Sequence, residues 1–330
     1  MKNSYFLLLI SVLLLSCCGQ KNATKAPVQS EEVKSDVTVP VFNADSAYSF
    51  VAKQVAFGPR VPNTVPHKEC ADFLTRKLEE YGAQVFVQQA VVTAYNKTKL
   101  NAVNIIGSYN PDNKRRILLF AHWDTRPYAD HDPDKSNWNK PIDGADDGGS
   151  GVGVLLEIAG LINENQISTG IDIIFFDAED YGTPEFDNNY SPNSWCLGSQ
   201  YWAKNPHIPN YKANFGILLD MVGAKGASFY KEETSVKYAS QYVELVWSTA
   251  RDLGYGKYFI NARGGSVIDD HYYVIERRKI PCLDIINFDP NNSPYGFGAH
   301  WHTLGDNMNV IDKETLKAVG QTVLDVIYKF

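Results

Sequence analysis

The sequence has little cysteine, no cluster of basic residues and no apolar run long enough to span a membrane. Five cysteines among 330 residues are too few for a scaffold held together by disulfides. The formal net charge is -7 and no stretch is strongly basic, so we expect no nucleic-acid partner. Because 44% of the residues are hydrophobic and 12% are aromatic, the chain can bury a large core. Cys70, Cys196 and Cys282 show no metal-binding spacing, and we expect them to be small buried residues.

The N-terminus has the pattern of a signal peptide. Lys2 precedes an apolar run over residues 6–15, which is shorter than a membrane-spanning helix. Leu14-Leu15-Ser16-Cys17 resembles the lipobox of bacterial lipoproteins, in which the cysteine carries the lipid after cleavage. We therefore predict a signal peptide over 1–16, lipidation at Cys17, a flexible tether over 17–40 and one domain over 41–330. This predicts a periplasmic protein anchored to a bacterial membrane by lipid, and an uncleaved N-terminal anchor is the alternative.

Apolar runs alternate with helical patterns through the rest of the chain. We predict strands at 85–92, 102–108, 117–122, 171–176, 216–220 and 283–287. We predict helices at 45–56, 65–81, 149–162, 195–203, 235–253 and 312–328. Because several strands are continuously apolar, both of their faces are expected to be buried. The pattern therefore predicts an α/β fold, a single domain with a central, mostly parallel mixed sheet flanked by helices.

Carboxylates and histidines follow the strands at the points where ligands bind in such sheets. The groups are His122-Trp123-Asp124, Asp146-Asp147, Asp177-Ala178-Glu179-Asp180, Asp220 and His300-Trp301-His302, with Asp269-Asp270-His271 in a predicted loop. A single Asp-Asp pair is more often a turn or a helix cap. Several acids converging at one buried edge need a cation, because an unpaired buried charge is costly. Oxygen and imidazole ligands without thiolates predict zinc in an open catalytic site.

In this order, these motifs resemble the zinc aminopeptidase and glutaminyl cyclase superfamily, and the cyclases more closely. The resemblance implies that Asp147, Asp180 and His302 bind one zinc ion per chain and that Glu179 is the general base. It also implies that Asp220 and Asp269 act near the substrate amine and that Trp195 and Trp301 form the walls of the substrate pocket. Two departures from the animal cyclases are Asp180 in place of glutamate and Ala121 in place of a disulfide cysteine.

The resemblance predicts a glutaminyl-peptide cyclotransferase, which converts N-terminal glutamine of peptides and secreted proteins to pyroglutamate and releases ammonia. The main alternative is a two-zinc aminopeptidase, in which His122 and Asp220 would hold a second metal. A catalytically inactive binding domain is a further alternative. Trp301 directly before His302, together with Ile268-Asp269-Asp270, favours the cyclase. We expect a monomer.

Overall fold

The computed structural model describes residues 38–191, 193–292 and 294–330. The predicted signal peptide, Cys17 and almost all of the predicted tether lie outside these residues. No helix in the described ranges combines the length and the apolar character that crossing a membrane requires.

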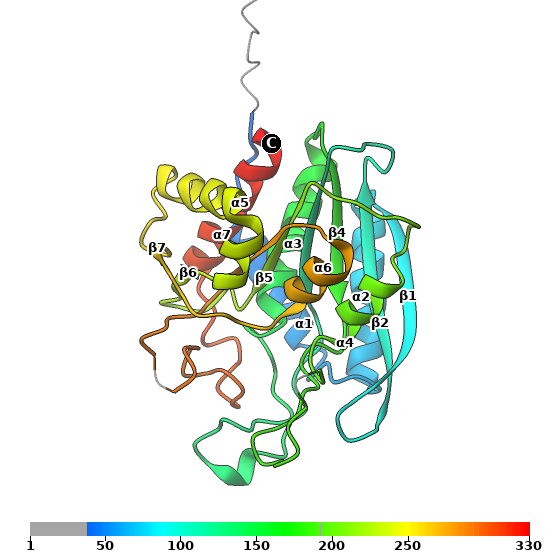
Figure 1. Cartoon of the computed structure of the whole chain (residues 1–330), viewed down its shortest axis with the longest axis vertical. Coiled ribbons are helices and arrows are strands. Elements are labelled where there is room, and N and C mark those ends of the chain that lie inside the picture. Colours follow the sequence, from blue (N-terminus) through cyan, green and yellow to red (C-terminus); the bar gives the residue numbers. More distant parts are fainter. Residues whose placement is uncertain (1–37, 192, 293) are drawn as a thin grey trace, which may run out of the picture. The chain divides into compact units, whose positions relative to one another are not determined.

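A six-stranded sheet forms the centre of the domain, with strand order β1-β2-β4-β3-β5-β8 (Figure 1). The strands are β1 (Gln84–Thr93), β2 (Lys99–Tyr109), β3 (Arg116–His122), β4 (Gly170–Phe176), β5 (Phe215–Asp220) and β8 (Cys282–Ile286). Strands β4, β3, β5 and β8 run parallel, whereas β1 and β2 pair in antiparallel orientation, as do β2 and β4. The predicted α/β domain with a mostly parallel mixed sheet is therefore confirmed.

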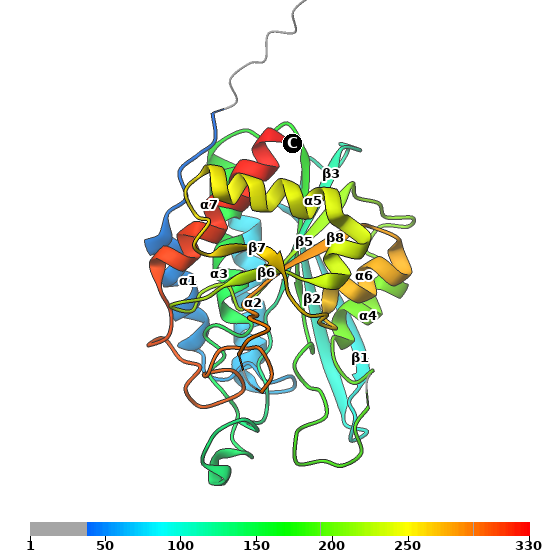
Figure 2. The same cartoon turned by 60° about the vertical axis from the view of Figure 1, so that its left-hand side comes forward.

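Helices cover both faces of this sheet (Figures 1 and 2). The helices are α1 (Ala44–Val55), α2 (Val65–Glu80), α3 (Gly149–Glu164), α4 (Leu197–Lys204), α5 (Glu233–Asp252), α6 (Asp270–Arg278) and α7 (Lys313–Lys329). Along β3, Ile117 and Leu119 join the core under α1, α3 and α7, whereas Leu118 and Phe120 join a second core with residues of α4 and α6. This alternation explains why β3 is apolar throughout, since each of its faces contacts a layer of helices.

Four short elements depart from the predictions. Helix α6 begins at Asp270, inside a segment that we predicted to be a loop, because the Asp269 side chain accepts the Asp270 N–H and caps the helix. Strands β6 (Phe229–Lys231) and β7 (Phe259–Arg263) form a separate two-stranded sheet. They were not predicted because runs of three and five residues are too short for a clear period. The loop between β3 and α3 also contains a short 3₁₀ turn, η1 (Lys135–Asn137).

Candidate active site

The carboxyl ends of three parallel strands bring the predicted site residues together. Strand β3 ends at His122, β5 ends at Asp220, and the segment after β4 carries Glu179 and Asp180. Since β3 lies between β4 and β5 in the sheet, these three ends are neighbours at one edge. Asp147 comes from the turn before α3, and Trp301 and His302 come from the loop before α7. Trp195 lies just before α4, and Asp269 is the N-cap of α6.

Asp147 reaches this edge from a tight turn at the start of α3. Asp306 accepts the backbone N–H groups of Asp146 at 2.8 Å and Asp147 at 3.1 Å, which holds the turn. Gly148 follows with φ of 90°, and a Cβ there would lie 2.5 Å from the carbonyl oxygen of Asp124. Only glycine therefore allows Asp147 to approach the end of β3 this closely.

The backbone of Glu179 and Asp180 is held by a single buried carboxylate. Asp124 Oδ1 accepts the Glu179 N–H at 3.0 Å, and Asp124 Oδ2 accepts the Asp180 N–H at 3.2 Å. Ala178 adopts a left-handed conformation with φ of 53°, which turns the chain sharply after β4. The two adjacent acids thus project from a rigid turn, so that they can take different chemical roles.

Asp147, Asp180 and His302 form a compact group of donor atoms that lie within 4.8 Å of one another. His302 Nε2 lies 3.3 Å from Asp180 Oδ1 and 3.6 Å from Asp147 Oδ2. Burial raises the pKa of Asp180 well above its usual value and lowers that of His302 well below its usual value. A neutral imidazole is the form that binds metal, and Asp180 Oδ2 is buried without a hydrogen-bond partner. The three residues therefore fit a zinc ion with an open position.

A second group shares Asp147 with the first. His122 Nε2 lies 3.0 Å from Asp147 Oδ1 and 3.3 Å from Asp220 Oδ1, and these three donors also lie within 4.8 Å of one another. Burial raises the pKa of Asp220 to about 8. The structure thus brings together the ligand group expected for one zinc ion and the His122 and Asp220 pair expected for a second metal.

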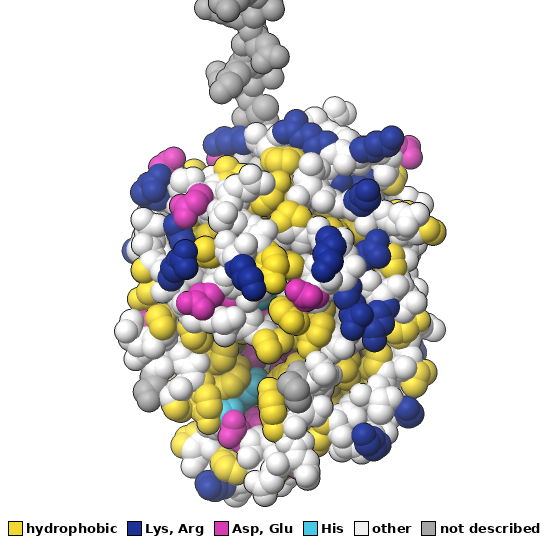
Figure 3. Space-filling view, in the orientation of Figure 1, with side chains coloured by type: hydrophobic (Ala, Val, Ile, Leu, Met, Phe, Trp, Pro, Cys, Tyr) yellow, Lys and Arg dark blue, Asp and Glu magenta, His cyan; other side chains and the backbone are white. Residues whose placement is uncertain are grey.

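Both groups adjoin a cavity of about 460 Å³ that also contains Glu179 and Asp269. Figure 3 shows a hollow with histidine and acidic side chains in its depth and hydrophobic side chains around it. The aromatic lining consists of Tyr190, Trp195, Phe288, Tyr295, Phe297 and Trp301. Burial is the largest influence on Glu179 and raises the pKa of its carboxyl well above the usual value. Every catalytic, substrate-binding and zinc-ligand residue predicted from the sequence therefore lines this one cavity.

Two aromatic rings flank His302. The indole of Trp301 stacks on the His302 imidazole with ring centroids 3.8 Å apart and also on His131 at 4.4 Å. The ring of Trp195 lies on the Arg126 guanidinium, whose central carbon is 4.6 Å from the ring centroid. Trp195 and Trp301 thus place aromatic surface on the cavity wall beside His302.

Sequence reasoning assigned no role to the residues that hold this constellation in place. Arg126 is buried, donates two hydrogen bonds of 2.6 Å to Asp130 and lies 3.5 Å from Asp180 Oδ1. Asp124 and Asp306 accept backbone N–H groups of the site turns, as described above. An arginine or aspartate in a loop has no periodic signal that distinguishes it from a solvent-exposed residue.

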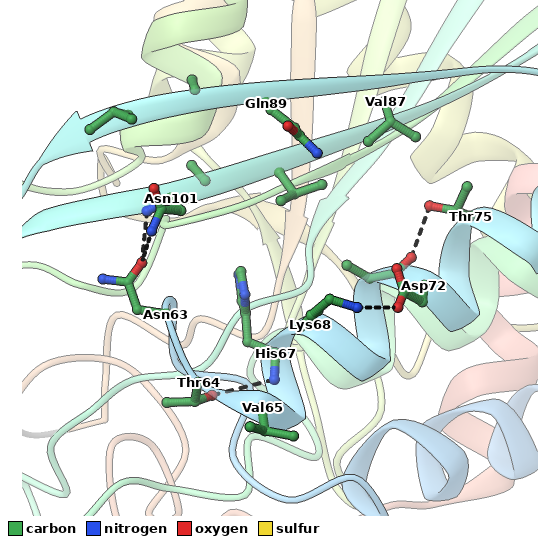
Figure 4. Close-up of a pocket in the computed structure, with 15 residues that line it drawn as sticks. Asn63, Thr64, Val65, His67, Lys68, Asp72, Thr75, Val87, Gln89 and Asn101 are labelled. Carbon is green, nitrogen blue, oxygen red and sulfur yellow. Dashed lines mark hydrogen bonds and ion pairs between the residues drawn. The ribbon is translucent and has the colours of Figure 1, made fainter.

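A larger cavity of about 760 Å³ lies between α2 and the β1–β2 hairpin (Figure 4). Its charged lining residues Lys68 and Asp72 pair with each other at 2.9 Å, and His67 is bonded to Asp177 at 2.8 Å. Most of the remaining lining is small, apolar or amide-bearing. This cavity lacks the convergent acids of the site at the strand ends.

Comparison with known proteins agrees with this geometry. The chain belongs to peptidase family M28, whose family profile matches residues 104–327. The solved glutaminyl cyclase of Tannerella forsythia is 66% identical, covers 88% of this chain and 100% of its own, and superposes with a TM-score of 0.87. A structure from Parabacteroides distasonis described as a Zn-dependent exopeptidase is 65% identical over 89% of this chain and 100% of its own, with a TM-score of 0.88.

Among curated proteins, the glutaminyl-peptide cyclotransferase of Bos taurus is 27% identical over 241 residues, which are 64% of this chain. The match spans 62% of the length of that bovine enzyme. Together these similarities place the chain with the bacterial glutaminyl cyclases of the zinc aminopeptidase superfamily, and the resemblance predicted from the motifs is confirmed.

Proposed function

We propose that this protein is a zinc-dependent glutaminyl-peptide cyclotransferase acting on N-terminal glutamine. The observation that carries the proposal is the position of Glu179, which lines an aromatic cavity next to the Asp147, Asp180 and His302 group without belonging to it. A carboxylate beside a metal site, but free of the metal, can accept a proton. The 66% identity to the Tannerella forsythia glutaminyl cyclase supports the same function.

Asp147, Asp180 and His302 would hold one zinc ion per chain. When bound, zinc would supply Lewis-acid activation of the γ-amide carbonyl group of the substrate. Trp195 and Trp301 would enclose the glutamine side chain and keep its extended conformers out of the cavity. Because the nucleophile and the carbonyl carbon belong to the same residue, holding the folded conformer removes much of the entropic barrier.

Glu179 would move the proton in this reaction. The α-ammonium group has an ordinary pKa of about 7.7 to 8.0, so it loses a proton to a nearby carboxylate at modest cost. The free α-amine then bonds to the γ-amide carbon and loses its second proton, and the amide C–N bond breaks. Glu179 passes the two protons in turn to the departing nitrogen, which leaves as ammonium. Asp220 and Asp269, which line the same cavity, would orient the substrate amine through hydrogen bonds.

The two-zinc aminopeptidase stays the second candidate, because His122 and Asp220 lie with Asp147 as a second metal group would. The two functions differ in what they require of the α-amine. A cyclase needs its lone pair free to attack, whereas an aminopeptidase can engage it with metal and uses activated water instead. An inactive binding domain is the third reading, and loss of activity in a zinc-bound Glu179→Gln variant would exclude it.

Mass spectrometry of a peptide beginning with glutamine tests the proposal directly. The purified zinc-loaded protein is expected to produce a peptide lighter by one ammonia. Release of free glutamine and a shortened peptide would instead assign the protein as an aminopeptidase. The same peptide with N-terminal asparagine is a matched control, because its shorter side chain cannot form the five-membered ring.

We also propose that the mature protein begins at Cys17, carries lipid there and extends through the tether 17–40 to a periplasmic catalytic domain over 41–330. The signal-peptide and lipobox patterns support this location. Mass spectrometry of the mature N-terminus and of a Cys17→Ser variant tests it. A wild-type protein without a lipid adduct at its N-terminus would contradict this proposal. Size-exclusion chromatography tests the expected monomer.

A further inference from the structure

We propose that Cys196 is a positioning residue for Glu179, whose carboxylate its thiol holds in the orientation that the reaction needs. The Cys196 S–H donates to Glu179 Oε1 across 3.0 Å. Among the described residues this is the one hydrogen bond recorded for the Glu179 side chain. The inference rests on the proposed function, since it assigns the thiol a role in the placement of the proposed base.

The backbone around Cys196 directs the thiol at Glu179. Cys196 occupies the N-cap of α4 with φ of 56° and ψ of 36°, a left-handed conformation that L-residues other than asparagine and aspartate seldom adopt. Its N–H donates to the Glu179 carbonyl at 2.9 Å, and the next residue, Leu197, donates to the Ala178 carbonyl at 2.9 Å. Two backbone bonds thus join the turn after β4 to the start of α4.

A cysteine at this N-cap does not serve the helix. Serine, threonine, asparagine and aspartate are favoured there because their oxygens accept N–H groups of the first turn. The Cys196 side chain makes no capping bond and instead contacts Glu179. The cysteine at this position and its left-handed backbone therefore both lead to the contact with Glu179, the proposed base.

A thiol suits this task because it is a weak, neutral donor. Burial, followed by the nearby Glu179 charge, raises the pKa of Cys196 well above its usual value, so the sulfur keeps its proton and can donate. A lysine or arginine in the same place would add a positive charge and weaken Glu179 as a base. The thiol restrains one carboxylate oxygen and leaves the other available to the substrate amine.

The test compares the zinc-loaded full-length variants Cys196→Ala and Cys196→Ser with Cys282→Ala as a control. Cys282 is equally buried at the start of β8, but its thiol donates to the Ile280 carbonyl just before that strand. Cys196→Ala removes the donor and is expected to lower kcat roughly tenfold with KM unchanged, because a misplaced base slows chemistry and not binding. Cys196→Ser keeps a donor and is expected to restore kcat to within roughly threefold of the wild type.

A Cys196→Ala enzyme with wild-type kcat would overturn the proposal, and so would a serine variant as slow as the alanine variant. If the alanine variant does not fold, the kcat of the serine variant and the wild-type crystal structure still test the proposal. A zinc-loaded wild-type crystal structure in which the Cys196 sulfur does not contact Glu179 would overturn it regardless of activity. If the wild type released ammonia from no glutamine peptide, the proposed function would fail, whereas the contact would still be read from that crystal structure.

Discussion

The indole of Trp195 lies almost parallel to the imidazole of His302, with an interplanar angle of 6° and ring centroids 5.9 Å apart. The Arg126 guanidinium also contacts this indole, with its central carbon 4.6 Å from the ring centroid, and it lies 3.5 Å from Asp180 Oδ1. One arginine therefore links a wall of the pocket to a proposed zinc ligand.

Replacing Trp195 by alanine is expected to raise KM for a glutamine peptide by about tenfold, since one aromatic wall of the cavity is lost. Zinc content should stay at the wild-type value. Trp195→Phe keeps an aromatic face and should show a smaller rise. Steady-state ammonia release measures both variants, and an unchanged KM in Trp195→Ala would refute the assignment of Trp195 to the pocket wall.

Replacing Glu179 by glutamine is expected to lower kcat by about 10² to 10⁴, because the amide cannot accept the proton of the α-ammonium group. Zinc content and melting temperature should change little, since Glu179 is not a member of the ligand group. Glu79→Gln makes the same chemical change on the exposed surface of α2 and serves as the control. Substantial activity in Glu179→Gln would show that another group transfers the proton.

Metal analysis distinguishes the cyclase from the two-zinc enzyme. We predict one zinc per chain in the fully active protein. Asp180→Asn should reduce zinc affinity by more than about 100-fold, beyond what is typical for loss of an outer-shell partner. His122→Ala should keep one zinc. Two tightly bound zinc ions in the wild type, one of them lost in His122→Ala, would instead favour the aminopeptidase.

Zinc removal should also destabilise the folded chain. Without the ion, burial and the neighbouring Asp147 oppose ionisation of Asp180, and bound zinc would offset this cost. A metal present at 100 times its Kd stabilises the native state by about 3 kcal/mol. Calorimetry before and after chelation should show a lower Tm that one equivalent of zinc restores. An unchanged Tm would mean that the group holds no metal tightly.

Acid stability is expected to depend on Glu232, the N-cap of α5. Burial opposes its ionisation, but His271 and the N–H groups of Ser235 and Thr234 prevail and lower its pKa from 4.5 to about 2. Because the folded-state pKa is the lower one, the carboxylate stabilises the protein fully above pH 4.5. This contribution is lost as the pH falls toward 2.

The size of this effect follows from the shift, which corresponds to about 3 kcal/mol at neutral pH and about 1 kcal/mol at pH 3. Urea unfolding of the wild type and of Glu232→Gln, at neutral pH and at pH 3, measures this difference in the free energy of unfolding. The difference between the two proteins should shrink on acidification. A difference independent of pH would show that the Glu232 contacts do not depend on its charge, and Glu79→Gln again provides a surface control.

The strand pattern and the strand-end motifs could be read from the chain because each depends on neighbouring residues. The apolar run of β3 predicts a strand buried on both faces, and parallel strands necessarily bring His122, Glu179 and Asp220 to one edge. Boundaries were less predictable in polar segments. Helix α6 was not predicted, because its start depends on the conformation of the Asp269 cap.

The supporting contacts have a different origin. Arg126 contacts Trp195, which lies 69 positions away in the sequence. Asp124 accepts the N–H groups of Glu179 and Asp180, more than 50 positions away. Cys196 looked like an ordinary small buried residue, and its contact with Glu179 exists because two loops fold against each other. Local patterns encode which residues enter strands, helices and buried ends, since periodicity acts over a few residues. Pairings between loops carry no such period and arise only when the packed sheet brings the loops together.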